Sequence, residues 1–301
     1  MAEKIKITFL GTGSAIPTEK RNHPSIFLEY KNEGILFDCG EGTQRQFRIA
    51  KLNPCKIKKI LISHWHADHV LGIPGLLQTL SLNNYNKELC IYGPVGTKKF
   101  FSFYNNLFIN KTKPITIKIF EIADSLIEEE DFFIESKEMK HNSPCLAFSF
   151  ITKDKKRIDK EKLKKLKIPN SPLIRNLLNG KKVSFNGKII DGKKIVYLEK
   201  GKKISYITDT LPNNKINLLI KNSDLLISEC TYSSEEKELA EEHFHLTSDY
   251  ISKEAKKSKV KKLILFHLSQ RYESSSNKIL DEAKRLFKET KIAEDFDKIV
   301  L

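Results

Sequence analysis

Residues Ile60–Gly75 read I-L-I-S-H-W-H-A-D-H-V-L-G-I-P-G, and this stretch decides how the rest of the chain is interpreted. A short apolar run ends in four potential metal ligands: His64, His66, Asp68 and His69. Neither a strand nor a helix presents all four on one face, so we predict an irregular loop that curls around a small ligand. Imidazole nitrogens together with a carboxylate oxygen suit a transition metal, most often zinc. We expect His64 and His66 to serve one ion, and Asp68 and His69 a second; the alternative is a polar loop whose histidines only make hydrogen bonds.

Length and composition indicate a globular protein. The 301 residues, of which 40% are hydrophobic, are enough for one large domain or two modest ones. No signal-peptide pattern follows Met1, and no apolar run approaches the ~18 residues that a membrane span needs. The five cysteines lie far apart without a C-x-x-C pair, which is typical of a reduced, cytoplasmic protein. We therefore expect a cytoplasmic protein whose zinc is not held by cysteines.

The positive charge is concentrated in one segment, residues 151–203, which we call the basic segment. The whole chain carries a net charge of +15. The basic segment holds 18 lysines and arginines against five acidic residues, and the rest of the chain is nearly neutral. A general compositional bias toward lysine would be spread evenly, so this charge indicates an anionic partner. We interpret the segment as an arm that projects from the body.

Several further histidines and aspartates follow apolar runs. Strands and helices alternate in the second half of the chain, which indicates an α/β fold. Four apolar runs end within three residues in a histidine or aspartate: Ile60–Ser63, Phe132–Met139, Lys203–Ile207 and Lys262–Phe266. Functional groups of sheet proteins tend to gather where strands end. We therefore predict one binuclear site, built from His64, His66, Asp68, His69, His141, Asp209 and His267. Taken singly, the last three would be ordinary turn or cap residues.

Asp38 stands where the apolar run Gly34–Phe37 gives way to a glycine-rich turn. A carboxylate at this position suits either a capping residue or a hydrogen-bond partner for a metal-binding histidine. The sequence alone leaves both interpretations open.

These residues resemble the metallo-β-lactamase superfamily, whose shared loop reads H-x-H-x-D-H, and within it the ribonuclease Z family of tRNA 3′-processing endonucleases. Four further segments are similar to that family: Gly11–Asn22, Phe37–Gln44, Gly72–Leu77 and Phe266–Tyr272. The resemblance implies a four-layer αβ/βα sandwich of residues 1–301, in which residues 151–203 are an inserted, projecting arm. It also implies two zinc ions per subunit, precursor tRNA as substrate, a homodimer, and products that carry a tRNA 3′-OH and a trailer 5′-phosphate.

The resemblance also assigns roles to individual residues. One zinc would be held by His64, His66 and His141, the other by Asp68, His69 and His267, with Asp209 bridging them. Asp68 would in addition accept a proton. His245 matches the histidine of the family's H-S-T loop, which here reads His-Leu-Thr, and Glu229 would orient it.

The basic segment is similar to the family's exosite arm, which grips the tRNA elbow. The residues expected to contact RNA are Lys162, Lys164, Lys165, Lys181, Lys182 and Arg271. The arm of the family usually contains a Gly-Pro motif, whereas the corresponding turn here is Pro169–Pro172, so its shape is expected to differ.

Two other functions share part of this pattern. A hydrolase of small phosphodiesters or thioesters would use the same metal loop, but it would have no need of the basic segment. An RNA-binding protein with a structural zinc would also be basic, but structural zinc sites are usually closed and rich in cysteine. Cleavage of a 3′-extended tRNA, compared with cleavage of a chromogenic phosphodiester, separates these functions.

Overall fold

The computed structural model describes residues 3–109 and 115–301. The described chain forms two compact units. The larger unit comprises the described parts of residues 1–128, 134–150 and 203–301, and the smaller unit comprises residues 129–133 and 151–202. Each unit is described by itself below.

One of the two large sheets of the larger unit is built from the first part of the chain and its last strand. Its seven strands lie in the order β18-β1-β2-β3-β4-β5-β6. The pairs β18–β1, β1–β2 and β2–β3 are antiparallel, whereas β3, β4, β5 and β6 run parallel. The bounds are β1 (Ile5–Gly11), β2 (Ser25–Tyr30), β3 (Glu33–Phe37), β4 (Ile57–Leu61), β5 (Leu89–Gly93), β6 (Ile117–Glu121) and β18 (Lys298–Val300).

The second sheet also has seven strands, in the order β17-β16-β15-β14-β9-β8-β7. Strands β14 to β17 run parallel, as the alternation of strands and helices in this half of the sequence predicts. The bounds are β7 (Ser125–Glu128), β8 (Phe132–Met139), β9 (Cys145–Thr152), β14 (Lys203–Ile207), β15 (Leu225–Glu229), β16 (Leu263–Phe266) and β17 (Thr290–Ile292).

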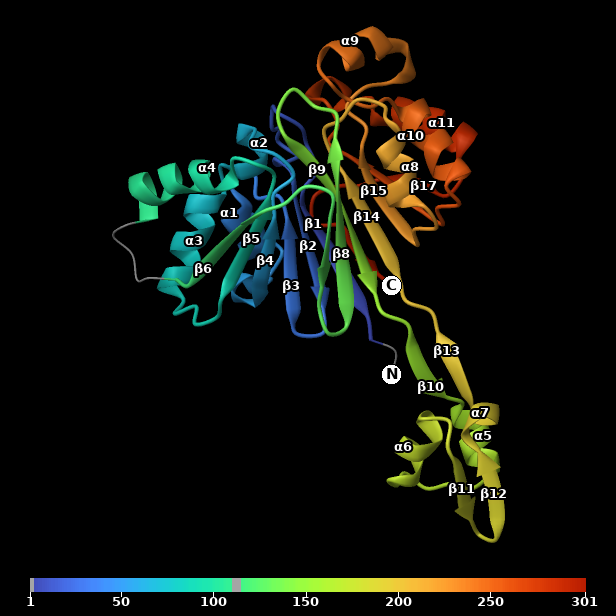
Figure 1. Ribbon diagram of the computed structural model, residues 1–301. Helices are drawn as coiled ribbons and strands as arrows, with labels where there is room; N and C mark the ends of the chain where they lie inside the picture. Colours follow the sequence, from blue (N-terminus) through green and yellow to red (C-terminus); the bar gives the residue numbers. More distant parts are fainter. Residues whose placement is uncertain (1–2, 110–114) are drawn as a thin grey trace. The chain divides into compact units, whose positions relative to one another are not determined.

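The two sheets pack face to face and helices cover their outer faces (Figure 1). Aromatic rings join the inner faces: the ring centroids of Phe37 and Tyr206 lie 5.1 Å apart, and those of Tyr30 and Phe150 lie 5.6 Å apart. Helices α1, α3 and α4 cover the first sheet, and α8, α10 and α11 cover the second. The predicted four-layer αβ/βα sandwich is therefore confirmed.

The α-helices of the larger unit have the following bounds: α1 (Thr43–Ile49), α2 (Ala67–Val70), α3 (Ile73–Leu82), α4 (Thr97–Tyr104), α8 (Asn214–Ile220), α9 (Lys237–Glu242), α10 (Ser248–Lys257) and α11 (Ser276–Leu286). Short 3₁₀ turns are formed by Pro54–Lys56, Ser234–Glu236 and Gln270–Tyr272, and α4 continues as a π-helical turn, Asn105–Ile109. The hydrogen-bond pattern of this helix thus changes after Tyr104.

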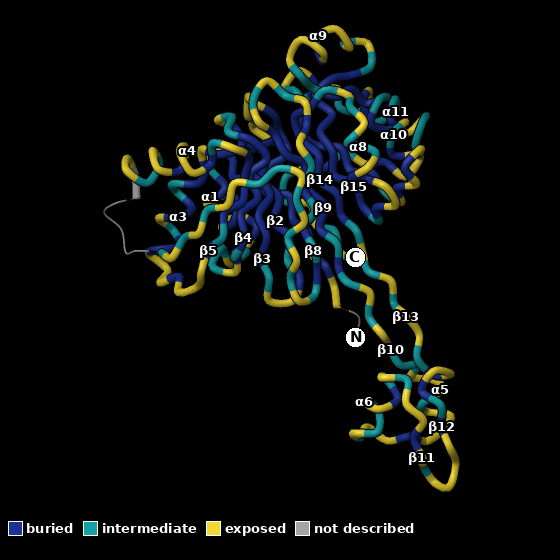
Figure 2. Tube along the Cα trace, in the orientation of Figure 1, coloured by how far each residue is buried: buried dark blue, intermediate teal, exposed yellow. Residues whose placement is uncertain are grey.

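Burial explains why the central strands read as continuous apolar runs. All five residues of β15 are buried, because this strand has neighbours on both sides and is covered on both faces (Figure 2). Strand β4, Ile57–Leu61, ends before the apolar run Ile60–Ser63 does. It ends early because the Ser63 backbone N–H donates to the Asp38 carboxylate instead of to a neighbouring strand.

The smaller unit has a hydrophobic core of its own, although its sequence is rich in lysine. Its core residues are Ile168, Leu177, Val183, Ile190 and Ile195. Around them lie β10 (Lys155–Ile158), α5 (Lys160–Lys165), α6 (Leu173–Leu178), β11 (Lys182–Phe185), β12 (Lys188–Asp191), α7 (Gly192–Ile195) and β13 (Val196–Glu199). This core is not evident from the sequence, because five residues leave little periodic signal.

Among residues 3–109 and 115–301, no helix combines the length and the apolar character that crossing a membrane requires.

Candidate metal centre

The H-x-H-x-D-H loop begins where β4 ends and runs into the single turn of α2. His64 is fully buried in the irregular part, His66 is the N-cap of α2, and Asp68 and His69 lie within α2. The chain therefore curls between His66 and Asp68, so that the two pairs of side chains leave it in different directions.

All seven predicted ligands come together in two groups. His64, His66, His141 and Asp209 form one group, and Asp68, His69 and His267 form the other; within each group the potential ligand atoms lie within 4.8 Å of one another. The strands β8, β14 and β16 deliver His141, Asp209 and His267 just beyond their last residues. The expectation that strand ends meet at one edge accounts for this arrangement.

Asp209 faces both groups. Its Oδ2 lies 3.6 Å from the Nε2 atom of His64 in the first group. Its Oδ1 lies 3.6 Å from Nε2 of His69 and 3.2 Å from Nε2 of His267 in the second. One carboxylate that presents an oxygen to each group has the geometry of a bridging ligand.

The buried imidazoles fit metal ions better than hydrogen bonds. The Nε2 atoms of His64, His69 and His267 are buried and have no hydrogen-bond partner among the described residues, which is a costly state for a polar atom. Their Nδ1 atoms, in contrast, are anchored: on Ser63 Oγ at 3.0 Å, Asp38 Oδ2 at 2.9 Å and Thr231 Oγ1 at 3.0 Å. A hydrogen bond at one ring nitrogen that leaves the other for a metal is typical of metal-binding histidines.

The charge states also suit metal binding. Burial lowers the pKa values of His64, His66 and His141, so these rings are neutral ligands near pH 7. Burial opposes ionisation of Asp209, but the neighbouring His267 and His69 outweigh it and hold the pKa of Asp209 well below its usual value. Burial alone would lower the pKa of His69, but the carboxylates of Asp68, Asp209 and Asp38 raise it well above its usual value. The centre therefore combines neutral imidazoles in the first group with ionised carboxylates, a donor set that suits zinc.

The Asp38 carboxylate accepts several hydrogen bonds, one of them from a histidine of the second group. Its Oδ1 accepts the Ser63 backbone N–H at 2.7 Å, and its Oδ2 accepts from Ser63 Oγ at 2.8 Å, Tyr206 OH at 2.7 Å and His69 Nδ1 at 2.9 Å. Its φ of +53° is in the left-handed region, where aspartate is tolerated better than most residues. The carboxylate does not cap a helix: α1 begins five residues later, after Gly42, and has no side-chain cap.

Replacing Asp38 with asparagine should weaken metal binding by roughly 10- to 100-fold, since the amide cannot hold His69 Nδ1–H as the carboxylate does. Competition with a chromophoric chelator measures the affinity. The matched control is Tyr206→Phe, which removes one hydrogen bond from the same carboxylate and leaves His69 untouched, and it should have a smaller effect. Equal metal affinity in the Asp38→Asn variant and the unmodified protein would contradict the assigned role.

Glu229 and His245 form a pair beside the second group. Both Glu229 oxygens lie near Nδ1 of His245, at 3.3 and 3.2 Å, and Glu229 is fully buried. Burial alone would lower the pKa of His245, but the carboxylates of Glu229 and Asp209 raise it to about 9 in the metal-free chain. His245 also lies within ligand distance of Asp209 and His267, so geometry alone allows it to be either a proton donor or a ligand.

Thr231 joins this pair to the metal centre, and sequence analysis did not single it out. Its Oγ1 lies 2.7 Å from Glu229 Oε2, 3.2 Å from His245 Nδ1 and 3.0 Å from His267 Nδ1. Ser63 and Tyr206 were missed in the same way, although both touch Asp38. Only the position of Thr231 two residues beyond Glu229, and of Ser63 just before His64, could have drawn attention to them.

A cavity of about 300 Å³ gives access to the centre. Its lining includes His66, Asp68, His141, Asp209, His245 and His267, together with Tyr232 and Arg271. Arg271 pairs with Glu236 and lies 5.3 Å from the Tyr232 ring centroid. Of the residues expected to contact RNA, Arg271 is therefore beside the metal centre, and the five lysines are in the smaller unit.

Comparison with known proteins decides the family. The chain is 40% identical over 294 residues to ribonuclease Z of Nanoarchaeum equitans, an alignment that covers 97% of this chain and 92% of the relative. The chain belongs to the ribonuclease Z family. Ribonuclease Z proteins are endoribonucleases, so membership places the chain among the nucleic-acid hydrolases.

Solved structures agree with this assignment. The short form of human tRNase Z superposes with a TM-score of 0.70 at 27% identity, and the match covers 98% of each chain. The metallo-β-lactamase fold protein YhfI of Bacillus subtilis superposes with a TM-score of 0.71 at 19% identity, over 99% of this chain and 100% of that one, and it supports the fold alone. A family profile described as anti-Pycsar protein Apyc1 matches residues 5–99, which include the metal loop.

Proposed function

We propose that this protein is a zinc-dependent endoribonuclease that removes the 3′ trailer from precursor tRNA and leaves a tRNA 3′-OH and a 5′-phosphate on the trailer. The observation that carries the proposal is the pair of ligand groups that share Asp209. The relatives named ribonuclease Z and the human tRNase Z structure support the substrate class. We place the protein in the cytoplasm, as a homodimer.

Each residue of the metal centre has a proposed role in the reaction. One zinc ion would be held by His64, His66 and His141, and the other by Asp68, His69 and His267. Asp209 would be a ligand of both ions. Bound zinc would supply Lewis-acid chemistry, since it neutralises charge on the phosphoryl oxygens and lowers the pKa of a water toward ~7. Asp68 would accept a proton from the attacking water at a carboxylate oxygen. His245, held by Glu229, would give a proton to the leaving 3′-oxygen.

The smaller unit would hold the RNA by its phosphates. Lys164, Lys165, Lys181 and Lys182 are exposed, and no ion pair is seen for them in the described part of the chain. Lys162 differs, since its Nζ lies 3.7 Å from Asp159 and 3.1 Å from the Lys194 carbonyl oxygen. Lysines on a small, separately folded unit act as point charges that position RNA without reading its bases.

The decisive experiment incubates the purified protein with a 3′-extended tRNA, with and without a metal chelator. Cleavage at the 3′ side of the acceptor stem that stops on chelation and returns with zinc supports the proposal. A chromogenic phosphodiester tested in parallel addresses the rival function. Hydrolysis of that compound without any cleavage of the tRNA would favour a hydrolase of small phosphodiesters.

Removing most of the smaller unit should raise the KM for precursor tRNA sharply and flatten its salt dependence. Lys155 and Glu199 are register partners in the β10–β13 pair, so a two-residue Asn-Gly turn can join them in place of residues 156–198. Each lost phosphate contact should reduce the slope of log K against log salt by ~0.7–0.9. Steady-state kinetics between low and moderate salt measure both effects.

The same variant carries its own control, since every proposed metal ligand lies outside the deletion. Its metal content should equal that of the intact chain. An unchanged KM and an unchanged salt slope would show that these lysines are a solvated surface without an RNA partner.

A further inference from the structure

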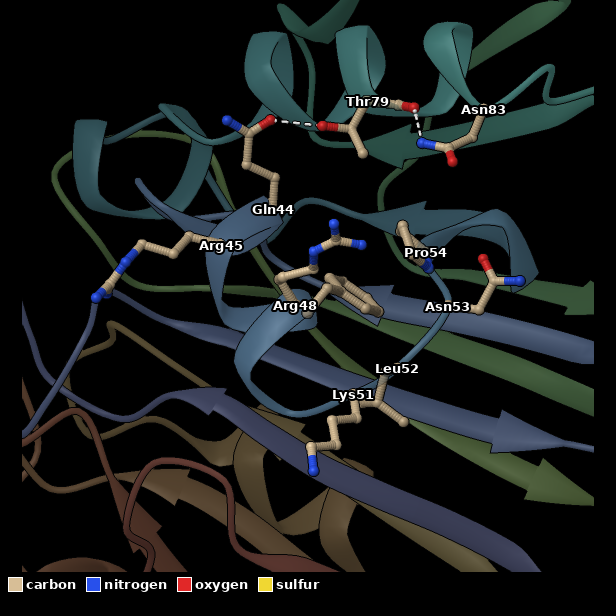
Figure 3. Close-up of a pocket in the computed structure, with 10 residues that line it drawn as sticks. Gln44, Arg45, Arg48, Lys51, Leu52, Asn53, Pro54, Thr79 and Asn83 are labelled. Carbon is tan, nitrogen blue, oxygen red and sulfur yellow. Dashed lines mark hydrogen bonds between the residues drawn. The ribbon is translucent and has the colours of Figure 1, made fainter.

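A second, larger cavity lies on the helix-covered side of the first sheet. Its volume is about 860 Å³, within the range of ligand pockets. Helix α1, the loop that follows it and helix α3 form its walls (Figure 3). The lining residues are Gln44, Arg45, Phe47, Arg48, Lys51, Leu52, Asn53, Pro54, Thr79 and Asn83. None of them lines the cavity of the metal centre.

The lining is cationic and contains no carboxylate. Arg45, Arg48 and Lys51 contribute three positive charges, and the other lining residues are neutral. Arginine is scarce in this chain, which has seven arginines among 53 basic residues, yet two of them are here. The planar guanidinium binds phosphate through two parallel hydrogen bonds, which lysine cannot do. The composition of the lining therefore favours a phosphate-bearing ligand.

These three cations have no partner within residues 3–109 and 115–301, neither an ion pair nor a side-chain hydrogen bond. Lysines that follow closely in the chain are paired: Lys56 Nζ lies 2.7 Å from Glu29, and Lys58 Nζ lies 2.6 Å from Glu33. Acidic partners are therefore present on the same sheet, but none of them reaches into the cavity.

The position of Arg45 argues against a purely helical role. Arg48 lies in the last turn of α1, where the helix dipole favours a cation. Arg45, however, is the third residue of α1, and at that end the dipole disfavours positive charge. The two arginines are three residues apart, and their side chains leave the helix in different directions (Figure 3). An anion in the cavity would supply the stabilisation that the helix itself does not give to Arg45.

Neutral side chains fix the walls and leave hydrogen-bond donors over. Thr79 Oγ1 donates to Gln44 Oε1 at 2.7 Å and ties α3 to α1, and Asn83 Nδ2 donates to the Thr79 carbonyl at 2.7 Å (Figure 3). Asn53 Oδ1 accepts the Cys55 backbone N–H at 2.9 Å. The side-chain oxygens of Gln44 and Asn53 therefore accept hydrogen bonds within the protein, and their amide N–H groups can donate to a ligand.

Both walls begin beside the metal centre. Helix α1 starts five residues after Asp38, and α3 starts four residues after His69. The cavity is lined by the later parts of both helices, since Thr79 and Asn83 lie at the end of α3 and Lys51 follows α1. RNA held there would extend away from the metal centre along α1 and α3. Contacts of this kind position nucleic acid and read no sequence.

We propose that the cavity between α1 and α3 is a phosphate-binding site that holds the backbone of the RNA substrate through Arg45 and Arg48, outside the metal centre. This assignment rests on the proposed function.

The test compares two double variants. In Arg45→Gln/Arg48→Gln the cavity loses both guanidinium groups, whereas Lys284→Gln/Arg285→Gln removes the same charge from the exposed last turn of α11. Fluorescence anisotropy in chelator measures the Kd for a 3′-extended tRNA at several salt concentrations. The cavity variant should bind roughly tenfold more weakly at moderate salt, and its slope of log K against log salt should fall by roughly 1.4–1.8, for two lost phosphate contacts. The α11 variant should match the unmodified protein.

Arg45→Lys/Arg48→Lys keeps the charge and should restore most of the slope. Its affinity can stay below that of the unmodified protein, because lysine lacks the paired hydrogen bonds of arginine. A salt slope of the lysine variant as low as that of the glutamine variant would show that the arginines act through the fold, and it would overturn the proposal. Equal slopes in the cavity variant and the unmodified protein would overturn it too.

Two further measurements separate other occupants. Calorimetric binding of inorganic phosphate that the cavity variant loses, together with an unchanged RNA slope, would assign the cavity to a free anion and reject RNA. Sedimentation velocity reports on self-association, and a changed assembly state in the cavity variant would assign the cavity to a contact between copies of the chain. Neither result bears on tRNA cleavage by the unmodified protein, which tests the proposed function by itself.

Discussion

Replacement of Asp68 with alanine should reduce cleavage of precursor tRNA to background, a loss of ~10⁴-fold or more, because one carboxylate has two proposed tasks. Its Oδ2 lies 3.2 Å from Nε2 of His69 and 3.5 Å from Nε2 of His267, so its removal leaves the second ligand group with two imidazoles. The same change removes the proposed proton acceptor. Affinity for tRNA should stay within a few fold, since lysines and arginines elsewhere would supply most of the binding.

Three measurements on this variant check the prediction: the single-turnover cleavage rate, the Kd for precursor tRNA in chelator, and the metal content. Asp281→Ala is the matched control, since it removes an exposed carboxylate from α11. Metal content should fall in the Asp68 variant and remain unchanged in the control. Full activity of Asp68→Ala would exclude Asp68 as ligand and as base.

The seven candidate ligands were predictable because their signal is local. His64, His66, Asp68 and His69 are adjacent in the chain, and His141, Asp209 and His267 each follow an apolar run at once. Strand ends meet at an edge of a sheet whatever the detailed packing, so the sequence pattern is enough to bring such residues together.

The hydrogen bonds that hold the ligands in place were not predictable in the same way, because they depend on contacts between distant parts of the chain. Tyr206 donates to Asp38 across 168 residues, from one sheet to the other. The sequence pattern of an apolar strand that contains a tyrosine is the same whether or not the tyrosine hydroxyl makes a hydrogen bond to a distant carboxylate. The cavity beside Arg45 has a similar origin, because only the packing of helix α1 against α3 creates it.

The smaller unit shows a different limit. Its charge was evident from the sequence, but its strands are four residues long and its core has five residues. The hairpin of β11 and β12 is closed by Asn186 and Gly187, both with positive φ, as this turn type requires. Turn chemistry of this kind is readable in a sequence, but a hydrophobic alternation over only four residues is not.

His245→Ala should lower the cleavage rate by about 10²–10⁴-fold without loss of metal, because a general acid, unlike a ligand, contributes only to the chemical step. The position of the imidazole supports this role: Nδ1 is held between Glu229 and Thr231, and the ring lines the cavity of the metal centre. The close approach of His245 to Asp209 and His267 makes the measurement of metal content essential. Zinc loss in this variant would mean that His245 is a ligand.

Glu229→Gln provides the matched comparison, since it preserves the shape of the buried side chain but removes its charge and one of its two acceptor oxygens. It should lower the rate less than His245→Ala does. The double variant should be no slower than His245→Ala alone, because a residue that acts through another has no effect once that other is absent. Additive losses in the double variant would show instead that Glu229 contributes independently, through its hydrogen bonds to the Thr210 backbone N–H at 2.9 Å and to the Thr231 hydroxyl at 2.7 Å.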